Sequence, residues 1–215
     1  MKTLALVHLA ISCFVTLPLN AKEPAAEDKA TQNWITMFDG KTFDGWKANE
    51  MADGWKIEDG TIRTAPGRSH LFYTASDFTD FEFKAEVKTT PGSNSGIYFH
   101  TKWQDKGWPK HGHESQVNQT HTDPVKSGSL YNVVKLYESP AKDGQWYEHR
   151  IVVKGNNIRV HINGKLAHDY TEPNGVTDER RLSKGTIALQ SHDPKSVVYY
   201  RNLRIRPLGD EEASQ

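Results

Sequence analysis

The stretch Phe81–Lys88, FEFKAEVK, decides the fold. Its apolar and charged side chains alternate without a break. One set is Phe81, Phe83, Ala85 and Val87, and the other is Glu82, Lys84, Glu86 and Lys88. Successive side chains of a β-strand point to opposite faces, so this pattern is typical of an antiparallel strand with one face in the core and the other in water. The stretch therefore predicts one wall of a β-sandwich.

Runs of the same kind, separated by turn residues, follow along most of the chain. Asp59-Gly60 and Asn163-Gly164 stand between alternating runs, and such dipeptides are strong hairpin signals. We expect strands at Trp34–Phe38, Gly54–Glu58, Thr61–Thr64, Gly96–Thr101, His113–Gln119, Glu148–Val153, Ile158–Ile162, Lys165–Tyr170, Gly185–Gln190 and Val197–Arg206. Asn174–Leu182 has room for a turn or two of helix. Short strands at this spacing predict an all-β jelly-roll sandwich of two antiparallel sheets.

The two ends of the chain differ from its strand-rich middle. The first residues have the features of a secretory signal peptide, with a basic start at Lys2, an apolar stretch and a small-residue end at Ala21. The predicted organisation is a signal peptide over residues 1–21, a flexible leader over 22–32, a single β-sandwich domain over 33–208 and a disordered tail over 209–215. We therefore expect a secreted or periplasmic protein.

Composition excludes several classes of partner. Lys and Arg together number 27, as do Asp and Glu, so the chain has no net field that would attract a polyanion such as nucleic acid. The apolar stretch near the start is interrupted by Pro18 and is too short to span a bilayer, so we expect no membrane insertion. The only cysteine, Cys13, lies in the predicted signal, and the mature chain would use no disulfide.

A row of polar side chains on one predicted strand points to a binding groove. Glu114, Gln116 and Asn118 alternate along this strand and share a face. Tyr98 and His100 would line the same face of the neighbouring strand. The segment between them carries Trp103 and Trp108, and aromatic rings of this kind pack on the apolar faces of sugar rings. The alternative is a face turned to bulk water.

Glu114 is the first candidate for a catalytic group. Conventional retaining glycosidases place two carboxyl groups about 5 Å apart, but Gln116 and Asn118 cannot ionise and no second acid is indicated. A single carboxylate beside amides and histidines suits abstraction of a proton, with polar groups stabilising the oxyanion that results. Two other interpretations stay open, in which Glu114 is a solvated strand residue or accepts hydrogen bonds from sugar hydroxyls.

Several further residues are candidates for contacts in the same groove. His100 and His192 stand out among the histidines, because a histidine can act as acid, base or metal ligand near neutral pH. Asn94 begins a turn before the Tyr98 strand, and Lys135 would offer a cation to an enolate or a hydroxyl. The histidine spacing is not that of a structural zinc site. The sequence indicates no particular cofactor, and a divalent cation held by loop carbonyls and Asp side chains stays open.

A series of short motifs resembles the 3-keto-disaccharide hydrolase family of secreted bacterial proteins, formerly a domain of unknown function. The motifs are Phe38-Asp39-Gly40-Lys41, Gly45-Trp46, Trp55–Gly60, Asp80–Phe83, Asn94–Tyr98, Glu114-Ser115-Gln116, Gly144-Gln145-Trp146, Asn163-Gly164-Lys165, Gly185–Gln190 before His192, and Tyr200–Ile205. The resemblance covers Trp34 to Leu208 and implies a concanavalin A-like sandwich. The stretch Trp103–His113, rich in tryptophan and histidine, departs from the family pattern and would reshape the pocket.

The resemblance also implies an activity: cleavage of glycosides already oxidised to a ketone at C3 of the sugar, as a hydrolase or lyase. It implies that Glu114 and His192 are the catalytic pair. It implies contacts to a saccharide or glycoside substrate from Asn94, Tyr98, His100 and Gln116, to which the groove argument adds Trp103, Asn118 and Lys135. The alternatives are a non-catalytic carbohydrate-binding module and a conventional glycoside hydrolase.

Overall fold

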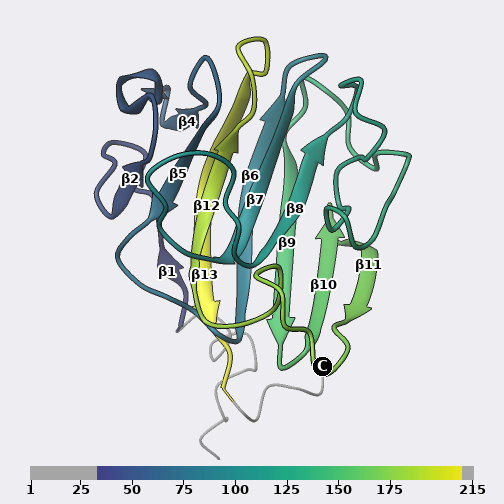
Figure 1. The fold of residues 1–215 in the computed structure, drawn as a ribbon. Helices are drawn as coiled ribbons and strands as arrows, with labels where there is room; N and C mark the ends of the chain where they lie inside the picture. Colours follow the sequence, from purple (N-terminus) through teal and green to yellow (C-terminus); the bar gives the residue numbers. More distant parts are fainter. Residues whose placement is uncertain (1–32, 210–215) are drawn as a thin grey trace, which may run out of the picture. The chain divides into compact units, whose positions relative to one another are not determined.

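Two antiparallel sheets form the fold of residues 33–209, which are the residues that the computed structural model describes (Figure 1). The larger sheet contains β1 (Ile35–Thr36), β3 (Lys56–Glu58), β4 (Thr61–Arg63), β6 (Phe81–Thr89), β9 (Tyr147–Lys154), β10 (Asn157–Ile162), β11 (Lys165–Thr171) and β13 (Val198–Pro207). The smaller sheet contains β2 (Trp46–Ala48), β5 (Ser69–Tyr73), β7 (Asn94–Thr101), β8 (His113–Asn118) and β12 (Thr186–Ser191). The predicted all-β sandwich is confirmed.

The strand orders place the sequence-distant segments side by side. The larger sheet runs β11-β10-β9-β6-β13-β4-β3, with β1 on β13, and the smaller sheet runs β2-β5-β12-β7-β8. The smaller sheet thus brings β8 and β12 to either side of β7, although more than 60 residues separate them along the chain. The predicted signal peptide, leader and residues 210–215 of the tail lie outside the described residues.

The core between the sheets contains the side chains that the alternation of FEFKAEVK selects. Phe81, Phe83 and Val87 are fully buried and Ala85 nearly so. They belong to one cluster with inward side chains of the opposite sheet. Burial of large apolar side chains of this kind stabilises a fold by about 1.5–3 kcal/mol each. Because the inner face of the smaller sheet packs in this cluster, its outer face is available for polar groups.

Two strands, β2 and β5, were missed, and one expected helical segment does not form. β5 carries Ser69 and His70 among its apolar residues, and because all five of its residues are buried, its polar positions do not mark a solvent face. Asn174–Leu182 forms turns without a helix. Within residues 33–209 the structure has one 3₁₀ turn, η1 (Ala52–Gly54), and no helix long and apolar enough to cross a membrane.

The alternation predicted that the charged face of β6 lies in water, and the structure contradicts this at Glu82. Glu82 is only 3% exposed. Arg150, on β9, donates from Nε to Glu82 Oε1 at 2.6 Å. Arg206, on β13, donates from Nε to Glu82 Oε2 at 2.8 Å. The long arginine side chains cover the carboxylate while their charges neutralise it.

We expect Glu82→Gln to lower the free energy of unfolding by about 2 kcal/mol at pH 7, because it leaves two arginines without their shared anion. Burial opposes ionisation of Glu82, but the hydrogen bonds from Arg150 and Arg206 outweigh it and lower the pKa. The stability that Glu82 contributes is therefore present above the unfolded pKa and is lost as the pH falls through the folded pKa. The difference in free energy of unfolding between the parent protein and Glu82→Gln, measured by urea titration, should therefore disappear in acid.

The matched control for this stability measurement is Glu58→Gln. Glu58 has a half-exposed side chain whose oxygen lies 3.8 Å from Arg63 Nε, a surface pair that we expect to contribute less than about 0.5 kcal/mol. Equal losses for Glu82→Gln and Glu58→Gln would contradict the role assigned to the buried carboxylate.

Candidate active site

A cavity of about 370 Å³ lies on the face of the smaller sheet that points away from the core. Its lining residues come from β7, β8 and β12 and from the loops at 102–112, 119–146, 172–185 and 192–197. It is lined by Asn94, Tyr98, Trp108, Glu114, Gln116, Asp123, Tyr131, Arg180, Gln190 and His192. Five of these residues were expected together from the sequence: Asn94, Tyr98, Glu114, Gln116 and His192.

Glu114 is the ionisable group on the cavity floor. It pairs across the strands with Tyr98, is 4% exposed, and accepts a hydrogen bond from Gln190 Nε2 at 2.9 Å. Burial raises the pKa of Glu114, although the hydrogen bond from the Tyr98 hydroxyl and the charge of Arg180 oppose the shift. A carboxylate with a raised pKa is a stronger base than an exposed one, and such shifts are typical of acid–base catalysts.

Gly96 provides the space for this carboxyl group. It lies beside Glu114 in the neighbouring strand, and a Cβ atom added to Gly96 would come within 2.3 Å of Glu114 Oε1 and 2.8 Å of its Cδ. No side chain tolerates contacts of that length, so the carboxyl group depends on a residue without a Cβ. A glycine inside a strand often marks such a close approach.

We expect Gly96→Ala to displace the Glu114 carboxyl group and to lower kcat by about 10- to 100-fold, since misplacing a catalytic group by about 1 Å has effects of this size. Steady-state kinetics with a substrate of the parent protein would measure the loss of kcat. Gly209→Ala is the control, because a Cβ there meets no atom within 4 Å. Unchanged kcat in Gly96→Ala would show that the carboxyl position is not critical.

Unpaired polar atoms line the cavity around Glu114. Gln116 donates to Asn94 Oδ1 at 2.6 Å, which leaves Gln116 Oε1 buried without a partner among the described residues. Gln190 Oε1 and Arg180 Nη1 are buried and unpaired there as well. Buried polar atoms are nearly always hydrogen-bonded in native proteins. Two acceptors and one donor are therefore available to a ligand rich in hydroxyl and carbonyl groups.

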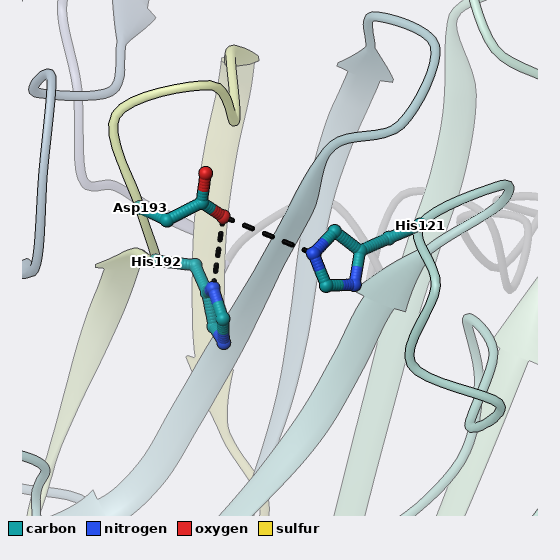
Figure 2. Close-up of side chains that lie close together, drawn as sticks. All are labelled: His121, His192 and Asp193. Atoms are coloured by element: carbon teal, nitrogen blue, oxygen red, sulfur yellow. Dashed lines mark hydrogen bonds and ion pairs between the residues drawn. The ribbon is translucent and has the colours of Figure 1, made fainter.

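His192 enters the cavity from the loop after β12, and Asp193 holds its ring (Figure 2). His192 Nδ1 lies 2.9 Å from Asp193 Oδ2, and His121 Nε2 lies 4.0 Å from the same oxygen. Although burial opposes ionisation of Asp193, hydrogen bonds from Ser196 and His192 lower its pKa to about 2. A carboxylate at Nδ1 favours the tautomer that leaves Nε2 free to face the cavity.

His121, His192 and Asp193 are also the residues in the described part of the chain that could hold a metal. One ligand atom from each lies within 4.8 Å of the others, and two histidines with a carboxylate suit a divalent transition metal. However, His121 Nδ1 accepts a hydrogen bond from the Asp123 N–H at 3.0 Å, so a neutral His121 carries its proton on Nε2. A proton on Nε2 blocks the His121 atom that would bind the metal, so the hydrogen bonds of His121 do not favour a metal site here.

His100 does not share the cavity face with Tyr98, contrary to the sequence-based prediction. Its backbone has φ of 54°, and β12 shifts register opposite it, so the alternation of β7 breaks. The His100 ring packs instead against the core rings of Phe81 and Phe99. Its Nε2 contacts the Thr79 carbonyl at 2.7 Å and its Nδ1 accepts from the Ser183 N–H, which indicates a structural role.

Three other predicted contact residues also lie outside the cavity lining. Asn118 continues the Glu114 face, but its amide donates to the carbonyls of Asp123 and Val125 and braces the following loop. Trp103 packs on Phe72 with a ring separation of 5.3 Å. Lys135 is exposed on a loop. None of the three lines the cavity in this structure.

Five lining residues were not among the predicted site residues: Trp108, Asp123, Tyr131, Arg180 and Gln190. Four of them lie in the loops, where no periodic pattern indicates which way a side chain points. Gln190 could have been found, because it lies in a strand two residues before His192. Trp108 had been noted only as a neighbouring aromatic residue.

A jelly-roll sandwich with a cavity of amides, aromatic rings and one buried carboxyl group defines a carbohydrate-active protein. The chain belongs to the 3-keto-alpha-glucoside-1,2-lyase-like domain family, which it matches over residues 33–206. This family is carbohydrate-active and similar to glycosyl hydrolases, and the resemblance inferred from the short motifs is thereby confirmed.

Individual relatives agree with this membership. The chain is 26% identical to a 3-keto-disaccharide hydrolase of Bacteroides thetaiotaomicron, over 81% of this chain and 78% of that protein. A structure from Parabacteroides distasonis, described as a candidate glycosyl hydrolase, has a TM-score of 0.71 at 23% identity and covers 86% of this chain and 98% of its own. A β-glucanase of Bacillus licheniformis shares the fold, with a TM-score of 0.53 at 13% identity over 83% of this chain and all of its own.

Proposed function

We propose that this protein cleaves glycosides whose sugar carries a ketone at C3, by removing the C2 proton, eliminating the C1 substituent and adding water to the resulting enone. The observation that carries the proposal is the buried Glu114 carboxyl group, with raised pKa, on the floor of a cavity that His192 also lines. A relative named for 3-keto-disaccharide hydrolysis supports the same substrate class.

The ketone explains why one strong base suffices. A carbonyl at C3 acidifies the C2–H bond, because the electron pair left behind is delocalised onto the C3 oxygen as an enolate. The enolate then expels the C1 oxygen, which needs a proton to leave. Addition of water to the enone completes a net hydrolysis, and release of the enone before that step gives a lyase.

The cavity offers a side chain for each step. Glu114 accepts the C2 proton, and the unpaired Arg180 Nη1 is a donor for the enolate oxygen. His192 as imidazolium, stabilised by Asp193, donates to the departing oxygen. Trp108 supplies an apolar surface for a sugar ring at the edge of the cavity.

A conventional two-carboxylate hydrolysis is the second candidate, because the structure brings Asp123 to the cavity lining beside Glu114. Asp123 Oδ1 accepts the Val125 N–H at 2.9 Å, which ties this carboxylate into its own turn. The substrate separates the two routes. A two-carboxylate enzyme hydrolyses an unoxidised glucoside, whereas elimination requires the C3 ketone.

The test is release of the aglycone from p-nitrophenyl 3-keto-glucoside and from the matched unoxidised glucoside. Our proposal predicts release from the ketone alone. Release from both at similar rates would favour the two-carboxylate route. Binding of either glycoside by calorimetry without release would favour a carbohydrate-binding module.

We further propose that the protein is exported to the periplasm or secreted, on the basis of the basic start, apolar stretch and small-residue end of residues 1–21. Cell fractionation of the full chain with N-terminal sequencing would test this, and a cytoplasmic protein that retains residues 1–21 would contradict it.

A further inference from the structure

A second, larger hollow adjoins the catalytic cavity on the side of Trp108. It has a volume of about 790 Å³, and it lies between the loop 102–112 and the loop 172–185. Trp108 and Arg180 line both the cavity and this hollow, which we call the outer groove. The two binding spaces are therefore adjacent and share a boundary made by these two side chains.

Contacts between the two loops make the outer groove a built feature. The Gly112 N–H donates to the Glu179 carbonyl at 3.0 Å, and His111 Nε2 lies 3.8 Å from Glu179 Oε1. Arg180 Nη2 reaches the Pro109 carbonyl at 3.4 Å. These contacts hold the two loops against each other. Its volume falls in the range typical of sites for small ligands.

The charges of the outer groove indicate what kind of ligand it fits. Lys106 and Lys110 come from one wall, Asp178 and Glu179 from the other, and Arg180 lies at the boundary. Cations and anions are nearly balanced, so the groove favours neither a polyanion nor a polycation. A sugar ring can both donate to carboxylates and accept from ammonium groups, and Trp108, which is 39% exposed, offers it an apolar face.

We propose that the outer groove binds the leaving-group side of the substrate, and that its ligand is an uncharged polyhydroxylated aglycone of one or more sugar residues. This inference rests on the proposed cleavage in the neighbouring cavity. The oxidised sugar occupies the cavity over Glu114, the scissile bond lies near Trp108 and Arg180, and the remaining sugar residues extend between the two loops.

The test compares two substrates that share the oxidised sugar: methyl 3-keto-glucoside and a 3-keto-trisaccharide oxidised at its non-reducing end. We expect the double variant Lys110→Ala/Asp178→Ala to lower kcat/KM for the trisaccharide by about tenfold more than for the methyl glycoside, as loss of hydrogen bonds to charged groups implies. Thr177→Trp, which fills the groove with a ring, should give the same selective loss. Lys102→Ala, outside both spaces, is the matched control.

Each outcome decides the question. Equal losses on both substrates, or no loss on either, would overturn the assignment of the groove to the aglycone. If no 3-keto-glycoside is cleaved, the proposed function fails, and calorimetry then tests the groove by itself. In that case a trisaccharide that binds more tightly than its monosaccharide, with the difference removed by Thr177→Trp, supports a saccharide groove, and equal affinities overturn it.

Discussion

Glu114→Gln is expected to lower kcat for a 3-keto-glucoside by about 10²- to 10⁴-fold, which is the usual contribution of a positioned base. The amide keeps the size and most hydrogen bonds of the side chain but cannot accept the C2 proton. Substrate affinity should change little, because the cavity keeps its other polar atoms. Steady-state kinetics and calorimetry with the same glycoside would separate the two effects.

The thermal stability of Glu114→Gln shows whether a loss of activity comes from misfolding. Burial raises the pKa of Glu114, so the ionised carboxylate costs stability at pH values above its folded pKa, and that cost shrinks as the pH falls through the folded pKa and is gone below the unfolded pKa. Gln carries no charge, so we expect the Tm of Glu114→Gln at pH 7 to equal or exceed that of the parent protein. Glu138→Gln, at an exposed position outside the cavity, should leave kcat unchanged. Turnover retained by Glu114→Gln would remove Glu114 from the mechanism.

Asp193→Asn is expected to lower kcat by about 100-fold while KM changes little. In the proposed mechanism Asp193 acts through His192, whose Nδ1 it contacts at 2.9 Å, and is a positioning residue. An amide can present a donor to Nδ1 and select the wrong tautomer. Steady-state kinetics would measure kcat and KM separately, and an unchanged kcat would contradict the role of Asp193.

His121→Gln distinguishes this arrangement from a metal centre. Without a metal, His121 is only a neighbour of the pair His192–Asp193, with its Nε2 4.0 Å from Asp193 Oδ2, and its loss should lower kcat by less than about tenfold. In a metal centre, His121→Gln should be as harmful as Asp193→Asn, and added zinc, manganese or cobalt should restore activity to the metal-depleted parent protein. Such restoration would contradict the roles of His192 as proton donor and Asp193 as its positioning residue.

The fold could be predicted because period-two alternation survives wherever one strand face is in the core. FEFKAEVK and the Asn-Gly and Asp-Gly turns place most strands within a few residues of their observed bounds. Alternation also places Glu114 and Gln116 on one face. It failed for Glu82, because paired arginines from two other strands bury its carboxylate, a cross-strand effect that a single strand does not reveal.

The cavity walls could not be predicted in the same way. Arg180 and Asp123 reach the cavity from loops that follow no periodicity, and their direction depends on contacts with distant residues. His100 was misplaced because its positive φ breaks the alternation at the end of β7. Asn118 keeps the predicted face, yet its hydrogen bonds to the following loop occupy its amide. Strand patterns predicted the floor of the site, and its walls required the three-dimensional fold.

The most direct test of the central claim is proton exchange at C2 of 1,5-anhydro-3-keto-glucitol in D₂O, followed by NMR. This sugar carries the C3 ketone but no leaving group at C1, so proton abstraction is observed alone. We predict that the parent protein replaces the C2 proton by deuterium well above the buffer rate, and that Glu114→Gln does not. Exchange at the buffer rate with the parent protein, or equal exchange with Glu114→Gln, would contradict the assignment of Glu114 as the base.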